Sequence, residues 1–323
     1  MSSVAIPVTA ATGRSFQSKR FDFASWFFTG VTGLATLLIL LILAVILGNI
    51  ILLGSKGFSW RFITAGTEQN MFDVNTAGVL PMIVGTTARV FIMTIFVIPI
   101  GVITAIYLSE YASATSPITR TIRAAISNLA GVPSIVFGLF GLGFFINFAG
   151  KNMDALFHPA AVEPIWGKPA IIWASLTLAV MTLPVVIVAT EEALKAIAPG
   201  LREGSLALGA TKLQTIAKIV FPQALPGVLT GAILAISRAA GEVAPILFTG
   251  AAYYMAHLPG ALTDQFMDLG YHVFVLSTQS PNIDQTRPIL YATVLTLLLL
   301  TFTLNVVAIF VRAHMRRKMG QHH

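Results

Sequence analysis

Six stretches of this 323-residue chain are each long and apolar enough to cross a lipid bilayer. A hydrocarbon core of roughly 30 Å is crossed by about 20 helical residues, and each stretch reaches that length. The stretches are 23–53, 79–108, 124–148, 169–190, 226–249 and 288–311. Because backbone amides cannot stay unpaired in lipid, such stretches form helices. The sequence therefore predicts an all-α integral membrane protein with six transmembrane helices.

The composition agrees with this class and excludes others. Hydrophobic residues make up 56% of the chain and charged residues only 10%, far from the average soluble domain. The net charge of +7 does not indicate nucleic-acid binding, because the basic residues lie in small groups beside apolar runs. The absence of cysteine excludes disulfides, thiolate metal sites and a cysteine nucleophile. We therefore expect the lipid bilayer, and no nucleic acid, among the partners.

The first apolar stretch follows Lys19 and Arg20, as the core of a signal peptide does. It is longer than such a core, however, and no small-residue cleavage site follows it. We interpret residues 23–53 as a retained anchor helix and residues 1–22 as a cytoplasmic N-terminal tail.

The distribution of basic residues predicts the orientation of the spans. Thirteen of the twenty lysines and arginines fall in the N-terminal tail, the second and fourth connections and the C-terminal tail, against five on the other side. Both termini, including the basic tail 312–323, are therefore expected in the cytoplasm, with the chain in a bacterial inner membrane. The two remaining basic residues, Arg89 and Arg238, lie inside spans, where a charge costs at least ~2.5 kcal/mol unless it faces water or a partner.

The cytoplasmic connection 191–225 is much longer than a turn between two spans requires. It has the pattern of two short helices, "LREGSLAL" and "TKLQTIAKIVF", with Gly209 at the turn between them and Pro222 ending the second. Leu206 and Leu208 place apolar side chains on the water side of the membrane. We expect this surface to dock in a groove of another protein. The alternative is a solvated helical hairpin without a partner.

The spacing of Glu203, Gly209, Ile219 and Pro222 resembles the EAA loop of ABC importer permeases, whose pattern is E-A-A, three residues, G, nine residues and I-x-L-P. The chain departs from it with Gly-Ser after the glutamate and with Phe before the proline. The resemblance implies a type I ABC importer permease fold, in which this loop is the coupling helix that enters a cleft on a separate ATP-hydrolysing subunit. The residues that it assigns to coupling are Glu203, Ala207, Leu208, Gly209 and Ala210.

The motifs of the catalytic alternatives are missing from the sequence. No G-x-x-x-x-G-K-[ST] phosphate loop, H-E-x-x-H metal motif or G-x-S-x-G nucleophile motif occurs. We therefore expect a subunit that is not an enzyme and binds no cofactor or metal, with ATP and Mg²⁺ bound by partner chains.

Three further segments narrow the resemblance. "GTTARVFIMTIFVIPIGVITAIYLSEYA" and "AGVPSIVFGLFGLGFF" are similar to the permeases of phosphate-specific ABC importers. "SRAAGEVAPILFTGAAYYM" resembles the PstA-type subunit, although Val243 stands where threonine is common. The similarity covers residues 78–311, the expected permease domain of five helices. It implies a heterodimer with a PstC-type permease, two PstB-type ATPase subunits, a periplasmic PstS-type phosphate-binding protein and a PhoU-type regulator.

Passage of phosphate, a tetrahedral anion, needs positive charge and hydrogen-bond donors, and the planar fork of arginine suits both needs. Arg238 lies about a dozen residues into the fifth span, near the midplane, and Glu242 follows one turn later. An exposed pair in this order contributes only a few tenths of a kcal/mol, so stability alone is a poor reason for it. One interpretation is that Arg238 lines the substrate pathway and is released from Glu242 by the passing anion. The other is that the pair only fixes helix packing.

Pro245 is expected to kink the fifth span beside these charges and to free backbone groups toward a cavity, because it removes one helical hydrogen bond. Arg89 lies nearer the outer end of the second span, where its side chain can also reach the interface, so a pathway role and a snorkelling role are both open. Hydroxyl groups complete the set, although each also suits helix packing. The substrate-pathway candidates are Arg238, Glu242, Arg89, Ser134, Ser237, Thr86 and Thr249.

The outer loop 251–287 holds Asp264, Asp268 and Asp284 against one basic residue. A helix lying on the membrane face here would receive the periplasmic binding protein, and an interfacial helix without a partner is the alternative.

Two rival functions remain open at this point. A self-contained secondary transporter would use Glu242 as an ion relay and would show inverted repeats, but the two halves of the chain show no convincing self-similarity. Within the ABC interpretation, sulfate or molybdate is the alternative substrate to phosphate.

Overall fold

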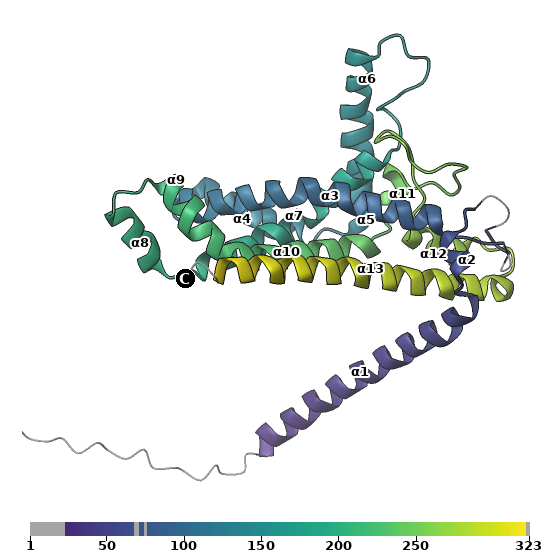
Figure 1. The fold of residues 1–323 in the computed structure, drawn as a ribbon, viewed down its shortest axis with the longest axis horizontal. Coiled ribbons are helices and arrows are strands. Elements are labelled where there is room, and N and C mark those ends of the chain that lie inside the picture. The colour runs from purple at the N-terminus through teal and green to yellow at the C-terminus, as the bar shows by residue number, and fades with distance from the viewer. Residues whose placement is uncertain (1–22, 68–70, 74–75, 321–323) are drawn as a thin grey trace, which may run out of the picture. The chain divides into compact units, whose positions relative to one another are not determined.

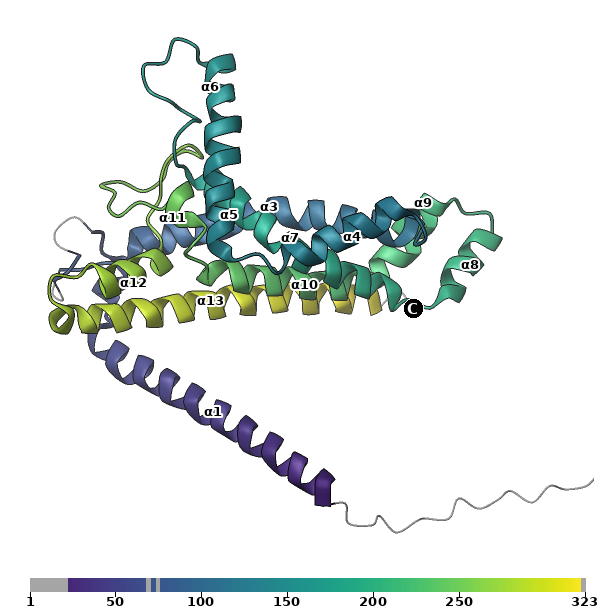
Figure 2. The ribbon, with the colours of Figure 1, turned by 180° about the vertical axis from the view of Figure 1, so that it is seen from behind.

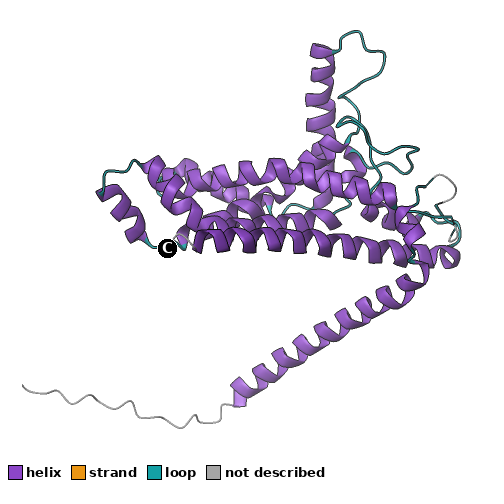
Figure 3. Ribbon diagram, viewed as in Figure 1, coloured by secondary structure: helices purple, strands orange, loops and turns teal. Residues whose placement is uncertain are grey.

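The computed structural model describes residues 23–67, 71–73 and 76–320, which form helices joined by loops (Figure 3). The expected N-terminal tail 1–22 lies outside the described residues. No strand occurs in the described part of the chain, where one isolated parallel bridge joins Ala251 and Phe266. The prediction of an all-α protein is confirmed.

The helices include three π-helical segments, labelled η. In chain order they are α1 (Phe23–Gly57), α2 (Trp60–Thr64), α3 (Leu80–Ile106), η1 (Tyr107–Tyr111), α4 (Pro117–Leu129), α5 (Ser134–Phe140), η2 (Gly141–Gly150), α6 (Lys151–Phe157), α7 (Ile171–Lys195), α8 (Pro199–Ala207), α9 (Lys212–Thr215), η3 (Ile216–Val220), α10 (Phe221–Gly241), α11 (Ile246–Thr249), α12 (Leu269–Thr278) and α13 (Ile283–Gly320).

Among the described residues, six helical stretches are long and apolar enough to cross a membrane. They are Phe23–Gly57, Leu80–Tyr111, Ser134–Phe157, Ile171–Lys195, Lys212–Gly241 and Ile283–Met315. The predicted number of six transmembrane helices is therefore confirmed, and the chain is a multi-pass membrane protein. The fifth, predicted as 226–249, is helical over Lys212–Gly241.

The chain divides into two compact units, residues 1–49 and 50–323. The described part of the first unit is the stretch 23–49 of α1, whose side chains are almost all exposed, as suits a lipid-facing helix. In the second unit, the end of α1 packs on α13: a Cβ added to Gly54 would lie 2.7 Å from the carbonyl oxygen of Tyr291.

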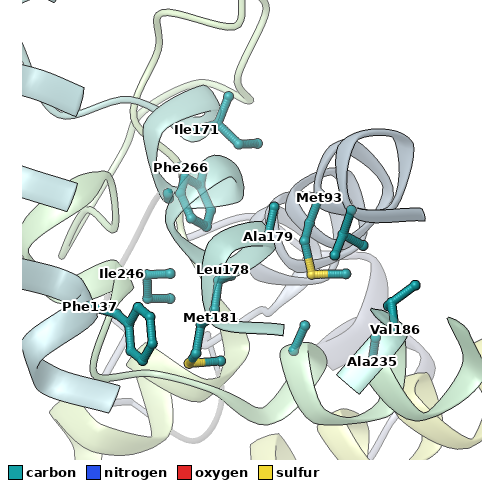
Figure 4. Close-up of a cluster of buried hydrophobic side chains, with 13 residues drawn as sticks. Met93, Phe137, Ile171, Leu178, Ala179, Met181, Val186, Ala235, Ile246 and Phe266 are labelled. Carbon is teal, nitrogen blue, oxygen red and sulfur yellow. The ribbon is translucent and has the colours of Figure 1, made fainter. Parts of the chain in front are cut away.

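Helix α7 is the centre of the second unit. Its most apolar window of 18 residues is 72% buried, against 33% for α3 with η1. Figures 1 and 2 show α3, α7, α10 and α13 running side by side. Apolar side chains of α3, α7 and α10 meet in the main core, among them Met93, Leu178 and Ala235 (Figure 4). This core packs together α3, which carries Arg89, and α10, which carries Arg238.

Small residues bring α10 very close to α7. A Cβ added to Gly231 would lie 2.6 Å from the Cβ of Ala189, and one added to Gly227 would collide with Ala193. Glycine facing alanine is a common way for helices to approach closely in a membrane, where dispersion contacts replace the hydrophobic effect as the driving force.

The third span begins at Ser134 rather than at residue 124. Residues Pro117–Leu129 form the separate amphipathic helix α4, and a turn at Gly131 and Val132 follows. Pro133 then has an extended conformation (φ −57°, ψ 138°) immediately before α5. Proline has no amide hydrogen and disfavours a helical residue before it, and both properties favour the interruption between α4 and α5.

The prediction that Pro222 ends a helix is wrong. Residues Lys212–Gly241 are helical throughout, and Pro222 lies in the first turn of α10. The π-helical segment η3 shifts the hydrogen-bond pattern just before it, so that the amide of Phe221 donates to the carbonyl of Ile216. Proline has no amide hydrogen, so one helical hydrogen bond is missing at this position, directly after the segment where η3 changes the pattern.

Candidate functional site

The fifth span breaks at the charged residues. Helix α10 ends at Gly241, Glu242 is extended (φ −79°, ψ 129°), and α11 begins only after Pro245. The predicted kink at Pro245 is therefore wrong, because the helix stops before it. The ring of Pro245 would clash with the carbonyl of Gly241 in a continued helix, and glycine is itself a weak helix former, so the chain leaves the helix at that point.

Arg238 and Glu242 form an accessible pair at this break. The Nε atom of Arg238 donates to Oε1 of Glu242 at 3.3 Å. The two side chains are 45% and 21% exposed. The long, partly exposed contact is typical of pairs that add little stability. Only the Nε atom of Arg238 donates to Glu242, so the contact does not use the Nη1 and Nη2 donors.

Arg89 is fully buried and does not extend to an interface. Its Nη2 and Nε atoms donate to Oδ2 of Asp268 at 2.7 and 3.0 Å, and neither side chain is exposed. Its Nη1 and Nη2 atoms also donate to the carbonyls of Ala239 and Ala240, at 2.8 and 3.3 Å. The snorkelling role is therefore excluded, because the guanidinium group is used entirely inside the protein.

Arg89 donates to two carbonyls at the end of α10, and the carbonyl of Ala239 also accepts the amide of Glu242 at 3.3 Å. The last carbonyls of a helix have no partner within it, and a cation near them is also favoured by the helix dipole. Ala239 and Ala240 are two of these last residues of α10. The prediction that Pro245 frees backbone groups toward a cavity concerns the carbonyl of Gly241, and it stays a prediction.

Thr86 and Asp268 join this cluster to α12. The hydroxyl of Thr86 donates to Oδ2 of Asp268 at 2.9 Å and accepts the amide of Leu269 at 3.0 Å. Asp268 is also the N-cap of α12, because its Oδ1 accepts the amide of Tyr271 at 3.2 Å. The carboxylate of Asp268 thus joins α3 to the start of α12. Arg89, on α3, also binds the end of α10.

The other hydroxyl candidates lie apart from this cluster. The Ser237 hydroxyl lies 2.9 Å from the carbonyl of Ile233 and 2.5 Å from Oδ1 of Asn305 on α13. Thr249 is buried and donates to the carbonyl of Pro245 at 2.9 Å, and Ser134 begins α5 in a partly buried position. Within the described residues, no group of three or more His, Asp or Glu side chains is placed to hold a metal ion.

Asp268 is a functional candidate that sequence reasoning missed. Its place among the acidic residues of the outer loop predicts an exposed side chain, yet it is 1% exposed. Two signals in the sequence pointed to it: an unpaired arginine inside a span requires an acidic partner, and an aspartate before the apolar run "LGYHVFVL" has the pattern of a helix N-cap.

The outer loop differs from the expected surface helix. Phe266 and Leu269 are fully buried, and α12 packs against α13 and α3. Asp264 remains partly exposed and accepts the amides of Ala261 and Gly260 at 2.9 Å each. These two hydrogen bonds lower the pKa of its carboxyl group. Phe266 and Leu269 thus complete the core instead of lying on the membrane face.

The predicted coupling loop forms a helical hairpin. Helix α8 ends at Ala207, and Gly209 makes the turn with φ +85°, a conformation that favours glycine. Thr211 and Gln214 cap each other at the start of α9 in a capping box. Leu208 is 91% exposed at the tip. The prediction that Gly209 forms the turn and that Leu208 projects outward is confirmed.

The remaining coupling candidates surround this tip. Glu203 and Ala207 are exposed on α8, and Ala210 is partly buried. A groove lies between the two arms of the hairpin. It is lined by Gly200, Leu201, Gly204, Ser205, Leu208, Ala210, Gln214, Lys218 and Ile219.

Six apolar spans, a charged pair at a broken helix and an exposed helical hairpin on the connection between spans four and five define a membrane permease subunit. Residues 97–321 match the family described as binding-protein-dependent transport system inner membrane component, and the chain belongs to this family. It is therefore a non-catalytic ABC importer permease, whose class associates with separate ATPase and substrate-binding partners.

Curated relatives agree with this family. The chain is 35% identical over 221 residues to the probable ABC transporter permease protein YqgI of Bacillus subtilis, which covers 68% of each chain. It is 39% identical over 170 residues to the phosphate transport system permease protein PstA of Mycobacterium leprae, covering 53% of this chain and 50% of the relative. PstA 1 of Mycobacterium tuberculosis is 36% identical, with 58% and 55% covered. The match thus spans about half the length of these two mycobacterial relatives.

Solved structures share the fold. A bacterial alginate ABC transporter in complex with an alginate-bound periplasmic protein contains a chain that matches with a TM-score of 0.64 at 13% identity, over 92% of this chain and 96% of that one. A chain of the MetNI methionine ABC transporter matches with a TM-score of 0.52 at 20% identity, over 74% and 94%. The type I importer permease fold is therefore confirmed.

Proposed function

We propose that this chain is the PstA-type subunit of an ATP-driven importer and forms part of the passage for inorganic phosphate. The accessible Arg238–Glu242 pair at the broken end of the fifth span supports this proposal most directly. Relatives named phosphate transport permeases support the choice of anion. The chain would lie in a bacterial inner membrane with both termini in the cytoplasm, as its basic residues favour.

In this proposal Arg238 provides the positive charge for the anion. Its contact with Glu242 is long and partly exposed, so a phosphate oxyanion, which accepts two parallel N–H donors, replaces the carboxylate at little cost. Arg89 is unsuited to that role because Asp268 neutralises it and two carbonyls occupy its other donors. We assign it instead to holding the end of α10 in place.

The partners follow from the same proposal. A PstC-type permease forms the other half of the passage, and a PstS-type protein delivers phosphate from the periplasm. Two PstB-type subunits bind ATP and Mg²⁺, and the hairpin from Glu203 to Ala210 passes their movement to the spans. A PhoU-type protein regulates the assembly.

Uptake by the assembled complex tests this function. The complex is reconstituted in vesicles with phosphate-loaded binding protein outside, and uptake of labelled phosphate and sulfate is measured with and without ATP inside. We expect uptake of phosphate, not sulfate, that requires ATP. Uptake driven by a proton gradient without ATP would contradict the ABC mechanism, and uptake of sulfate in place of phosphate would contradict the substrate.

A matched pair of variants tests the coupling surface in the same assay. Leu208→Glu places a charge on the exposed tip of the hairpin and should abolish ATP-driven uptake. Val162→Glu changes a fully exposed valine of the loop between spans three and four and should leave uptake near the wild-type rate. Equal uptake by both variants would remove the hairpin tip from the ATPase interface.

A further inference from the structure

Both arms of the coupling hairpin hold the same short segment of the second span. From α8, the Nη2 and Nε atoms of Arg202 donate to Oε1 of Glu110 at 2.9 and 3.2 Å. From the start of α9, the ammonium group of Lys212 lies 5.0 Å from the ring centroid of Tyr111. Glu110 and Tyr111 belong to η1, the π-helical end of this span.

Arg202 is held more firmly than a surface ion pair would be. Its Nη2 and Nη1 atoms also donate to the carbonyls of Leu194 and Ile197, at 2.7 and 2.8 Å, where α7 ends. The side chains of Arg202 and Glu110 are only 22% and 10% exposed. Several charge-assisted hydrogen bonds from one guanidinium group in a partly buried site fix its position. The contact therefore acts as a joint between α8, η1 and the end of α7.

This joint is separate from the surface that we assign to ATPase docking. Leu208 and Glu203 are exposed, whereas Glu110 is largely covered by the chain itself. At the opposite end, the same continuous helix Leu80–Tyr111 carries Arg89, which holds the carbonyls at the end of α10. The second span thus contacts the coupling hairpin at one end and the broken fifth span toward the other.

We infer that Arg202 is a positioning residue that fastens the coupling helix α8 to the second span, so that movement of the hairpin is passed to that span through Glu110. This inference rests on the proposed function, since it concerns how ATP hydrolysis is coupled to import. Without the Arg202–Glu110 contact, the hairpin still docks on the ATPase subunit. Its movement then changes the conformation of the loops that flank α8 and does not move the second span.

The ratio of phosphate imported to ATP hydrolysed tests the joint. The reconstituted complex carries Arg202→Ala, Glu110→Gln or both, and the ratio is measured beside the basal ATPase rate and the amount of ATPase subunit that copurifies. Each single change should lower the ratio about fivefold, the low end of typical coupling effects. The double variant should fall no further, because the two residues act as one unit. Basal hydrolysis and copurification should stay at the wild-type level.

The control is Arg120→Ala, which removes an exposed arginine of α4 and should leave the ratio unchanged. A wild-type ratio in Glu110→Gln, or a double variant whose loss is the product of the single losses, would overturn the inference. If Arg202→Ala reduces copurification, the near-isosteric Glu110→Gln decides the question alone. Absence of ATP-driven uptake in the wild-type complex would instead contradict the proposed function.

Discussion

The guanidinium group of Arg89 lies 2.7 Å from the carboxylate of Asp268, and neither side chain is exposed. The pair joins residues that are 179 positions apart in the chain. It also occupies the carbonyls where α10 ends. Next to it, on the same turn of α10, Arg238 makes only a long, partly exposed contact with Glu242. Of the two arginines inside the predicted spans, Arg89 is thus fixed by buried contacts, and Arg238 is the one that we propose for the substrate passage.

Asp268→Asn should destabilise the protein strongly. The change leaves a buried cation without its counterion, which typically costs about 3–5 kcal/mol. Thermal or denaturant unfolding of the purified complex in detergent measures the loss. Asp284→Asn is the matched control, because Asp284 is exposed at the start of α13. Equal stability of the two variants would show that the buried pair is not needed.

Arg238→Ala should barely change stability. Partly exposed ion pairs usually contribute less than about 1 kcal/mol, and the two side chains here are 45% and 21% exposed. The same unfolding measurement applies. A loss as large as that of Asp268→Asn would favour the interpretation that the Arg238–Glu242 pair serves helix packing.

The stability of the protein should fall as the pH decreases from about 6.5 to 4. Burial in α12 lowers the pKa of His272 to about 4. In this range the unfolded chain binds a proton at this histidine and the folded chain does not, so the free energy of unfolding decreases with falling pH. Unfolding of wild type and His272→Gln at pH 7 and pH 5 gives the contribution of this residue.

His257→Gln, at an exposed histidine of the outer loop, provides the comparison for the same substitution at a residue that is not buried. An identical loss of stability at pH 5 in wild type and in His272→Gln would contradict the effect of burial.

Gly209→Ala should weaken coupling through local strain in the hairpin. A side chain at φ +85° costs about 1 kcal/mol, because its Cβ crowds the next carbonyl. We expect reduced ATP-driven uptake with normal assembly of the complex. Gly204→Ala tests the same substitution inside α8, where an added Cβ meets nothing within 4 Å. It should leave uptake unchanged, and an equal loss in both variants would exclude strain at the turn as the cause.

Local sequence patterns predicted the spans and the turn of the hairpin. The six apolar stretches became six helices because hydropathy and length act over consecutive residues. Gly209 was recognised because glycine between two helical patterns commonly takes a positive φ. The ends of the spans were less certain: α4 was merged with the third span because its alanines and isoleucines continue the apolar run.

Contacts between distant segments were beyond the reach of those patterns. The partner of Arg89 lies on a connection that looked like a solvent-facing loop, and only the packing of α12 against α3 buries it. Pro245 correctly indicated an irregularity in the helix of the fifth span. Whether the helix bends or ends there depends on which groups hydrogen-bond to the last carbonyls of α10, and those groups come from other segments. In this fold the helix stops at Gly241, and Arg89 donates to the carbonyls of Ala239 and Ala240 just before that end.

Phosphate uptake by Arg238→Ala tests the central claim most directly. Wild type, Arg238→Ala and the exposed control Arg120→Ala are reconstituted as complete complexes in vesicles that contain ATP, and initial rates of phosphate uptake are compared at equal amounts of assembled complex. Our account predicts that the rate of phosphate uptake by Arg238→Ala falls at least about tenfold. A tenfold loss corresponds to losing roughly 1.4 kcal/mol of interaction with the anion during its passage. The control should keep the wild-type rate. Wild-type uptake by Arg238→Ala would contradict the claim that this arginine lines the phosphate passage.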